Sequence, residues 1–100
     1  MSKKIIRVLI VDDELEMLQF LSRFFSRKGY EVHTAEGGEE AWKSIEETMY
    51  DLVVCDLVMD DFSGTELLER VRATDNSLPF IIVTGAGTIE TAVEAIKLGA

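Results

Sequence analysis

The chain has 100 residues, of which 19 are acidic and 10 basic, and its formal net charge is −9. This length is typical of one domain, and a hydrophobic content of 47% excludes a disordered segment. The acidic excess disfavours binding to nucleic-acid phosphates, and every apolar run is far shorter than the ~18 residues of a membrane span. A single cysteine excludes an internal disulfide and predicts a protein of the reducing cytoplasm.

Strand-like and helix-like segments alternate from the start. Ile5–Val11 is rich in β-branched residues, which predicts a strand buried on both faces. Apolar residues at helical spacing follow over Glu14–Lys28, and Gly29 is a typical residue to end that helix. Glu31–Ala35 predicts a second strand, and Glu39–Thr48 a second helix.

The second half continues this alternation. Leu52–Asp56 predicts a third buried strand, and the capping box that begins at Ser63 predicts the start of a third helix. Phe80–Thr84 predicts a fourth strand, and Thr88 is placed to cap a last helix over Ile89–Leu98.

This βα alternation predicts an α/β fold, an open doubly wound parallel sheet with helices on both faces, formed by residues 1–100 as one domain. Ligands of such sheets bind beyond the carboxyl ends of the strands. Asp12 and Asp13 follow the first strand, Asp56 ends the third, and Thr84 ends the fourth. If the first and third strands are neighbours, three carboxylates meet there and repel one another unless a cation is bound. Oxygen ligands without histidine favour Mg2+, with Mn2+ as an alternative.

Each of these residues also has an ordinary structural interpretation. Asp13 is placed to cap the first helix, Asp56 to form a turn, and Thr84 to be a strand-end hydroxyl with a satisfied hydrogen bond. Their coincidence at one edge favours a site. There Asp56 would be the nucleophile toward a phosphoryl group, Asp12 and Asp13 would hold the metal, and Thr84 would donate a hydrogen bond to a phosphate oxygen.

Three motifs lie in order at these strand ends: VLIVDDE at Val8–Glu14, DLVM with a glycine eight residues after the aspartate at Asp56–Gly64, and IIVTG at Ile81–Gly85. With them the chain resembles the receiver domain of two-component response regulators. The resemblance implies a flavodoxin-like fold with strand order 2-1-3-4-5. It also implies Mg2+ at the acidic pair and a metal contact from the backbone carbonyl of Val58.

The resemblance further implies partners. A sensor histidine kinase or a phosphotransfer protein would pass a phosphoryl group to Asp56 and so switch a covalently attached output domain. Thr88–Ala100 is most similar to receivers fused to ATP-dependent transcriptional activators. Neither a membrane nor direct nucleic-acid binding by this segment is expected, and a homodimer is compatible with the pattern.

The chain departs from the family pattern in two places. Asp60 stands four residues after the acceptor, where the family usually has proline, and Asp61 follows it, so a looser and more negative loop is expected. The family's strand-five lysine, fifth strand and fifth helix would lie beyond Ala100, which leaves strand order 2-1-3-4 and Phe80–Thr84 as an edge. We therefore expect residues 1–100 alone to be partly unfolded, self-associating or completed by another chain.

The remaining reactive or bulky residues favour structural roles. His33 is expected at a surface or edge position without acidic neighbours at ligand spacing, and Cys55 on the opposite sheet face as a core residue. Trp42 and Met49 are expected to pack rather than bind a ligand.

Three other functions compete with a phosphorylation switch. An aspartate-based phosphatase usually carries a second Asp two residues after the first, where this chain has Val58, so a turnover enzyme is not expected. A flavin-binding domain needs a Ser-, Thr- and Gly-rich first loop to hold phosphate. The first loop of this chain is Asp-Asp-Glu, which would repel phosphate, so a flavin-binding domain is not expected. A phosphorylation-independent interaction module of the same fold remains the alternative function.

Overall fold

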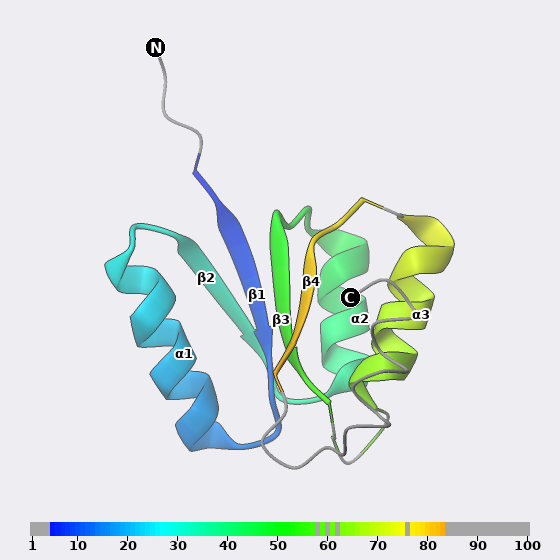
Figure 1. Ribbon diagram of the computed structural model, residues 1–100, viewed down its shortest axis with the longest axis horizontal. Coiled ribbons are helices and arrows are strands. Elements are labelled where there is room, and N and C mark those ends of the chain that lie inside the picture. The colour runs from blue at the N-terminus through cyan, green and yellow to red at the C-terminus, as the bar shows by residue number, and fades with distance from the viewer. Residues whose placement is uncertain (1–4, 58, 60, 62, 76, 84–100) are drawn as a thin grey trace.

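The computed structural model describes residues 5–57, 59, 61, 63–75 and 77–83. Over these residues strands and helices alternate as predicted (Figure 1). The elements are β1 (Arg7–Val11), α1 (Leu15–Arg27), β2 (Glu31–Ala35), α2 (Gly38–Glu47), β3 (Leu52–Asp56), α3 (Gly64–Thr74) and β4 (Phe80–Val83). The helix expected over Ile89–Leu98 lies outside the described residues. Among the described elements, no helix has both the length and the apolar composition needed to cross a bilayer.

The described strands form one parallel sheet in the order β2-β1-β3-β4, as predicted. Helix α1 covers one face of the sheet, and α2 and α3 cover the other (Figure 1). The fold is therefore an open, doubly wound α/β sheet.

Side-chain alternation along the central strands divides the core between the two faces. Leu9 and Val11 of β1 pack into the cluster that α2 and α3 cover, whereas Val8 and Ile10 pack with Leu18 of α1. All four of these β1 side chains are almost completely buried. Burial on both faces explains why this strand is a continuous apolar run in the sequence.

Two expectations from the sequence need correction, and a third is confirmed. Ile5 and Ile6 lie before β1 and are exposed, because the partner strand β2 begins at Glu31, opposite Arg7. Met49, expected to pack, is 88% exposed. The expectation for Trp42 is confirmed, because its side chain packs against the α2–α3 core.

His33 lies on the outer strand β2, as expected, but it does have an acidic neighbour. Its Nε2 is 2.9 Å from a carboxylate oxygen of Glu31, and its Nδ1 is 3.0 Å from the hydroxyl of Tyr50. Glu31 also accepts a hydrogen bond from Nε of Arg7 at 2.6 Å, and these two contacts lower the pKa of its carboxyl group, the Arg7 contact more strongly. These contacts tie His33 to the fold.

Strand β4 is an outer strand of the described sheet and carries an apolar side chain, Ile81, that is 48% exposed. We expect the 100-residue chain to self-associate through this edge, because an apolar outer strand is a template for pairing. Ile81→Lys should reduce self-association in sedimentation velocity measured at several concentrations. Ala73→Lys, which adds the same charge on exposed α3, is the matched control. A chain that stays monomeric at every concentration would contradict this expectation.

Candidate metal centre and acceptor site

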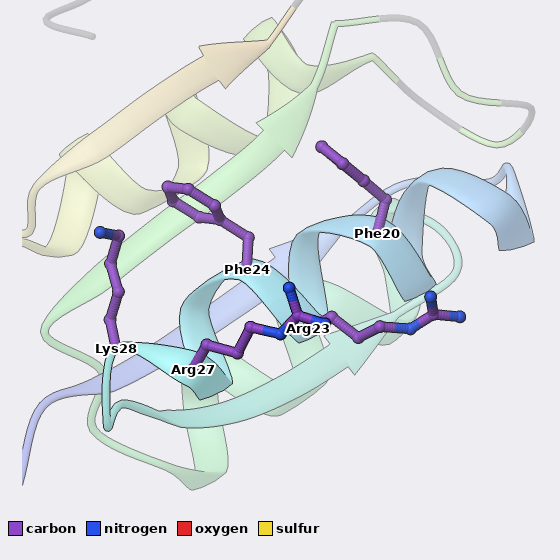
Figure 2. A pocket seen from close by; sticks show the side chains of 5 residues that line it. All are labelled: Phe20, Arg23, Phe24, Arg27 and Lys28. Carbon is purple, nitrogen blue, oxygen red and sulfur yellow. The ribbon is translucent and has the colours of Figure 1, made fainter.

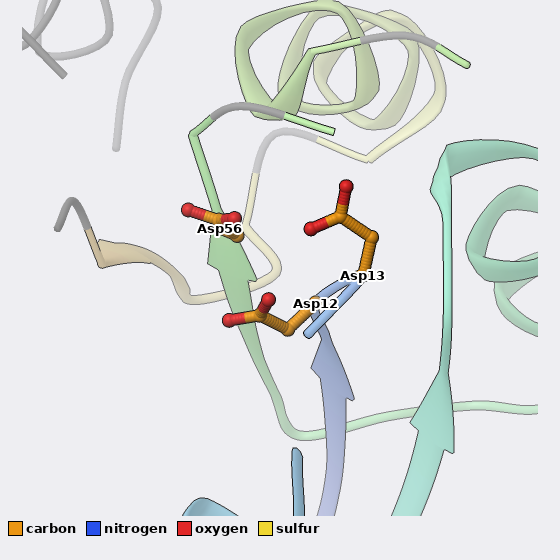
Figure 3. A group of neighbouring side chains, drawn as sticks. All are labelled: Asp12, Asp13 and Asp56. Atoms are coloured by element: carbon orange, nitrogen blue, oxygen red, sulfur yellow. The ribbon is translucent and has the colours of Figure 1, made fainter. Parts of the chain in front are cut away.

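The carboxyl ends of β1 and β3 bring the three predicted aspartates together. The two strands are parallel, and Val11 of β1 pairs with Cys55 of β3. Asp12 and Asp56 each follow one member of this pair, so they reach the same edge of the sheet. Asp13 comes next after β1, and its carboxylate faces the other two (Figure 3).

One carboxylate oxygen from each of Asp12, Asp13 and Asp56 lies within 4.8 Å of the others. Asp12 is 5% exposed, Asp56 is half-buried, and Asp13 is the most exposed of the three. At such distances each ionised pair repels by about 3 kcal/mol at an effective dielectric constant of ~20, and less where solvent reaches Asp13. Oxygen donors that share negative charge in this way fit a hard divalent cation such as Mg2+.

Backbone hydrogen bonds fix the position of Asp12. Its N–H donates to the carbonyl of Ala35 at 3.1 Å, and its Oδ1 accepts from the N–H of Glu14 at 2.9 Å. Glu14 is the N-cap residue of α1, and no side-chain cap bond is made there among the described residues. Capping is therefore not the role of Asp13, and this leaves its carboxylate directed to the acidic cluster.

Cys55 is completely buried in the α2–α3 core, as predicted from strand alternation. Burial raises the pKa of its thiol, and the charges of Asp56 and Asp12 raise it further. The thiol is therefore kept protonated and unreactive.

The loop that follows Asp56 returns close to the acceptor strand at Gly64, the first residue of α3. The N–H of Gly64 donates to the carbonyl of Leu57 at 2.8 Å, and a Cβ at position 64 would lie 2.3 Å from the carbonyl oxygen of Asp56. This contact explains the glycine of the second motif, because any side chain would displace the acceptor backbone. Ser63 caps α3 as predicted, its hydroxyl accepting from the N–H of Glu66 at 3.2 Å.

Two further predicted site residues, Val58 and Thr84, lie outside the described residues, and so does Asp60. Val83, the neighbour of Thr84 in sequence, pairs with Asp56. Asp61 is described, and its carboxylate is not part of the acidic cluster. It accepts hydrogen bonds from the N–H groups of Gly38 and Glu39 at the start of α2. Sequence reasoning predicts only added negative charge at Asp61 and misses this contact, because its partners lie more than twenty residues away.

A separate hollow of about 490 Å³ lies along α1 (Figure 2). It is lined by Phe20, Arg23, Phe24, Arg27 and Lys28. Phe20 is 64% exposed, and the Lys28 ammonium lies 4.9 Å from the centre of the Phe24 ring. None of its lining side chains is a carboxylate, histidine or cysteine that could hold a metal ion. The acidic cluster, where ligands of such sheets bind, is therefore the candidate site.

Comparison with known proteins gives one consistent result. The family model described as "Response regulator receiver domain" matches residues 8–100. The chain is 36% identical over 95 residues to the transcriptional regulatory protein ZraR of Escherichia coli strain K12, which covers 95% of this chain and 22% of that protein. The chain thus spans about a fifth of the length of the curated relatives it matches.

Solved structures agree in fold. A CheY-like response regulator receiver domain protein from Methanospirillum hungatei JF-1 superposes with a TM-score of 0.92 at 33% identity, over 97% of this chain and 78% of that one. The beryllofluoride-activated NtrC4 receiver domain dimer superposes with a TM-score of 0.87 at 37% identity, over 94% and 78% of the two chains.

Gly64→Ala should damage both the fold and the acidic site, because the new Cβ would press on the carbonyl of Asp56. We expect a loss of about 1–3 kcal/mol in the free energy of unfolding, typical of overpacking, and weaker divalent binding. Gly29→Ala is the control: its φ of 90° makes alanine unfavourable, yet its Cβ would meet no atom within 4 Å. Denaturant unfolding and Mg2+ titration separate the two effects. Equal Mg2+ affinity in both variants would contradict the role given to Gly64.

Proposed function

Since the chain belongs to the family of response regulator receiver domains, we propose that it is a phosphorylation switch. Asp56 accepts a phosphoryl group from a sensor histidine kinase or a phosphotransfer protein. The observation that carries this proposal is the convergence of Asp12, Asp13 and Asp56 within 4.8 Å at the ligand-binding edge of the sheet.

Accessibility and position favour Asp56 as the acceptor. Asp12 is almost completely buried, and one of its oxygens is held by the Glu14 N–H. Asp13 lies beyond the end of β1, whereas Asp56 is the last paired residue of β3 and is half-buried. A half-buried carboxylate on a fixed backbone is both reachable and held in place for attack.

In the proposed step, a carboxylate oxygen of Asp56 forms a bond to the phosphorus of a phosphohistidine as the phosphorus–nitrogen bond breaks. The departing imidazole nitrogen keeps the electron pair and takes up a proton from water. The product on Asp56 is an acyl phosphate.

The donor set fits a hard cation, and bound Mg2+ would offset the charge of the carboxylates and of the incoming phosphoryl group. We assign Asp12, Asp13, Asp56 and the backbone carbonyl of Val58 as the residues that hold it. Thr84 is assigned as the hydrogen-bond donor to a phosphoryl oxygen. The assignments of Val58 and Thr84 rest on the family resemblance and on their positions in the sequence.

The partners of the whole protein are proposals as well. The relatives ZraR and AtoC are named as regulatory proteins, and this chain spans 22% and 20% of their lengths. We propose that phosphorylation controls an attached output domain that regulates transcription in the cytoplasm. The alternative, a receiver-fold interaction module without phosphorylation, is disfavoured by the presence of all three aspartates.

Asp56→Asn should abolish phosphoryl acceptance and leave the fold intact. The amide is nearly isosteric with the carboxylate but is not a nucleophile, and it removes one charge from a repelling cluster, so stability should hold or rise. Intact-mass spectrometry after incubation with a small phosphodonor and Mg2+ measures the adduct. Glu69→Gln, an exposed position on α3, is the control and should be labelled like the wild type. Substantial labelling of the Asn variant at another residue would overturn the assignment.

Mg2+ alone should stabilise the chain, because it reduces repulsion among the three carboxylates. At ten times the dissociation constant, we expect a gain of about 1.4 kcal/mol and a Tm higher by several degrees. Asp13→Ala should remove most of this gain, whereas Glu69→Ala, which removes the same charge elsewhere, should keep it. A Tm that does not respond to millimolar Mg2+ would count against the metal centre.

A further inference from the structure

Asp61 joins two loops that are distant in the sequence. It lies in the loop between β3 and α3, and its carboxylate reaches the first turn of α2. Oδ1 accepts from the N–H of Gly38 at 2.9 Å, and Oδ2 accepts from the N–H of Glu39 at 2.9 Å. Both oxygens of one side chain thus bind consecutive backbone donors from a segment more than twenty residues earlier.

The start of α2 needs this contact. Its N-cap residue is Gly37, which has no side chain, and among the described residues no cap bond comes from that position. Gly38 is buried, so its N–H would be left without a partner at a cost in free energy. A carboxylate at a helix N-terminus also interacts favourably with the helix dipole. Asp61 therefore supplies, from another loop, the cap that α2 lacks.

The backbone at Gly37 is shaped to receive Asp61. A Cβ at position 37 would lie 3.0 Å from Oδ2 and 3.1 Å from Oδ1 of Asp61. The φ of Gly37 is −169°, an extended conformation that any residue adopts. The absence of a side chain at this position is thus explained by the space that the Asp61 carboxylate needs, and not by backbone conformation.

The loop that Asp61 restrains is the one that leaves the acceptor. It begins after Asp56, and its far end is fixed where the Gly64 N–H donates to the Leu57 carbonyl. Asp61 is a second point of attachment, between Asp56 and α3. In the proposed function this same segment of sequence contributes Val58, whose backbone carbonyl is assigned as a metal ligand.

We propose that Asp61 is a positioning residue of the acceptor site, which acts by fastening the loop after Asp56 to the N-terminus of α2. The proposal rests on the proposed function of Asp56. Loss of the carboxylate should release the loop. Mg2+ binding would then have to order the loop, and the conformational entropy lost would weaken the binding. Asp61 itself touches neither the metal nor the phosphoryl group.

The test compares Mg2+ affinity, with Mg2+ as the only ligand, in the intact chain and in three variants by calorimetric titration. Asp61→Ala should weaken binding by about three- to tenfold, below the effect of residues bonded directly to metal ligands. Asp61→Asn should be intermediate, because its amide oxygen accepts only one of the two bonds. Amide hydrogen exchange at Gly38 and Glu39 should speed up in the same order.

The third variant separates positioning from helix capping. In Asp61→Ala combined with Gly37→Ser, the new hydroxyl can cap α2 locally, in space that the Asp61 carboxylate no longer fills. Thermal stability should recover toward wild type, while Mg2+ affinity should remain as weak as in Asp61→Ala. Recovery of affinity together with stability would overturn the proposal and make Asp61 a cap only.

Three other results would also overturn the proposal. The first is an equal loss of Mg2+ affinity in Asp61→Ala and Asp61→Asn that disappears at high salt. That result would mean that Asp61 acts only through its long-range charge. Wild-type affinity in Asp61→Ala would overturn the positioning role alone. Absence of Mg2+ binding in the wild type would overturn the proposed metal centre and this assignment with it.

Discussion

The site depends on the parallel pairing of β1 with β3. Because both strands run in the same direction with Val11 opposite Cys55, the residues that follow them arrive at one edge of the sheet. A slip of one residue would exchange the two faces of a strand, moving Leu9 and Val11 out of the α2–α3 core. Core burial on both faces therefore fixes the register, and the register places Asp12 beside Asp56. The positions of the charged side chains are therefore determined by the hydrophobic packing of the strands that precede them.

Asp12 is positioned by backbone contacts that leave its charge in place. The bonds that hold Asp12 are made with backbone groups of Ala35 and Glu14. The acceptor loop is held by the Leu57 carbonyl at one end and by the N–H groups of α2 through Asp61. A basic partner in place of the Glu14 N–H would have offset the charge of Asp12, but it would also have weakened the attraction for a cation. Attachment through the backbone fixes the geometry and preserves the negative potential that a metal needs.

Local sequence patterns predict most of the fold, because the alternation of apolar and polar residues along each element reflects which side chains are buried. The bounds of β2 and β3 are those expected, and the alternation along β3 placed Cys55 in the core. Errors arose where a distant partner decides the outcome. The strand β1 begins at Arg7 because β2 offers no partner earlier. For Asp13 the ordinary alternative, a helix cap, is the one that fails, because its carboxylate lies in the acidic cluster to which the sequence prediction assigned it. The sequence pattern around Asp61 indicates only its negative charge, because its hydrogen-bond partners lie more than twenty residues away.

The role of Asp61 also bears on the missing proline. The family resemblance implies proline at the position of Asp60, where its ring would restrict one backbone torsion of the loop. In this chain the restraint comes from the next residue and acts through space, by two hydrogen bonds to α2. A proline restrains its loop whatever the rest of the molecule does, whereas Asp61 does so only while the first turn of α2 is formed. The proposed role of Asp61 therefore couples the order of this loop to the start of α2, and under that proposal a ligand that shifts the loop also acts on α2.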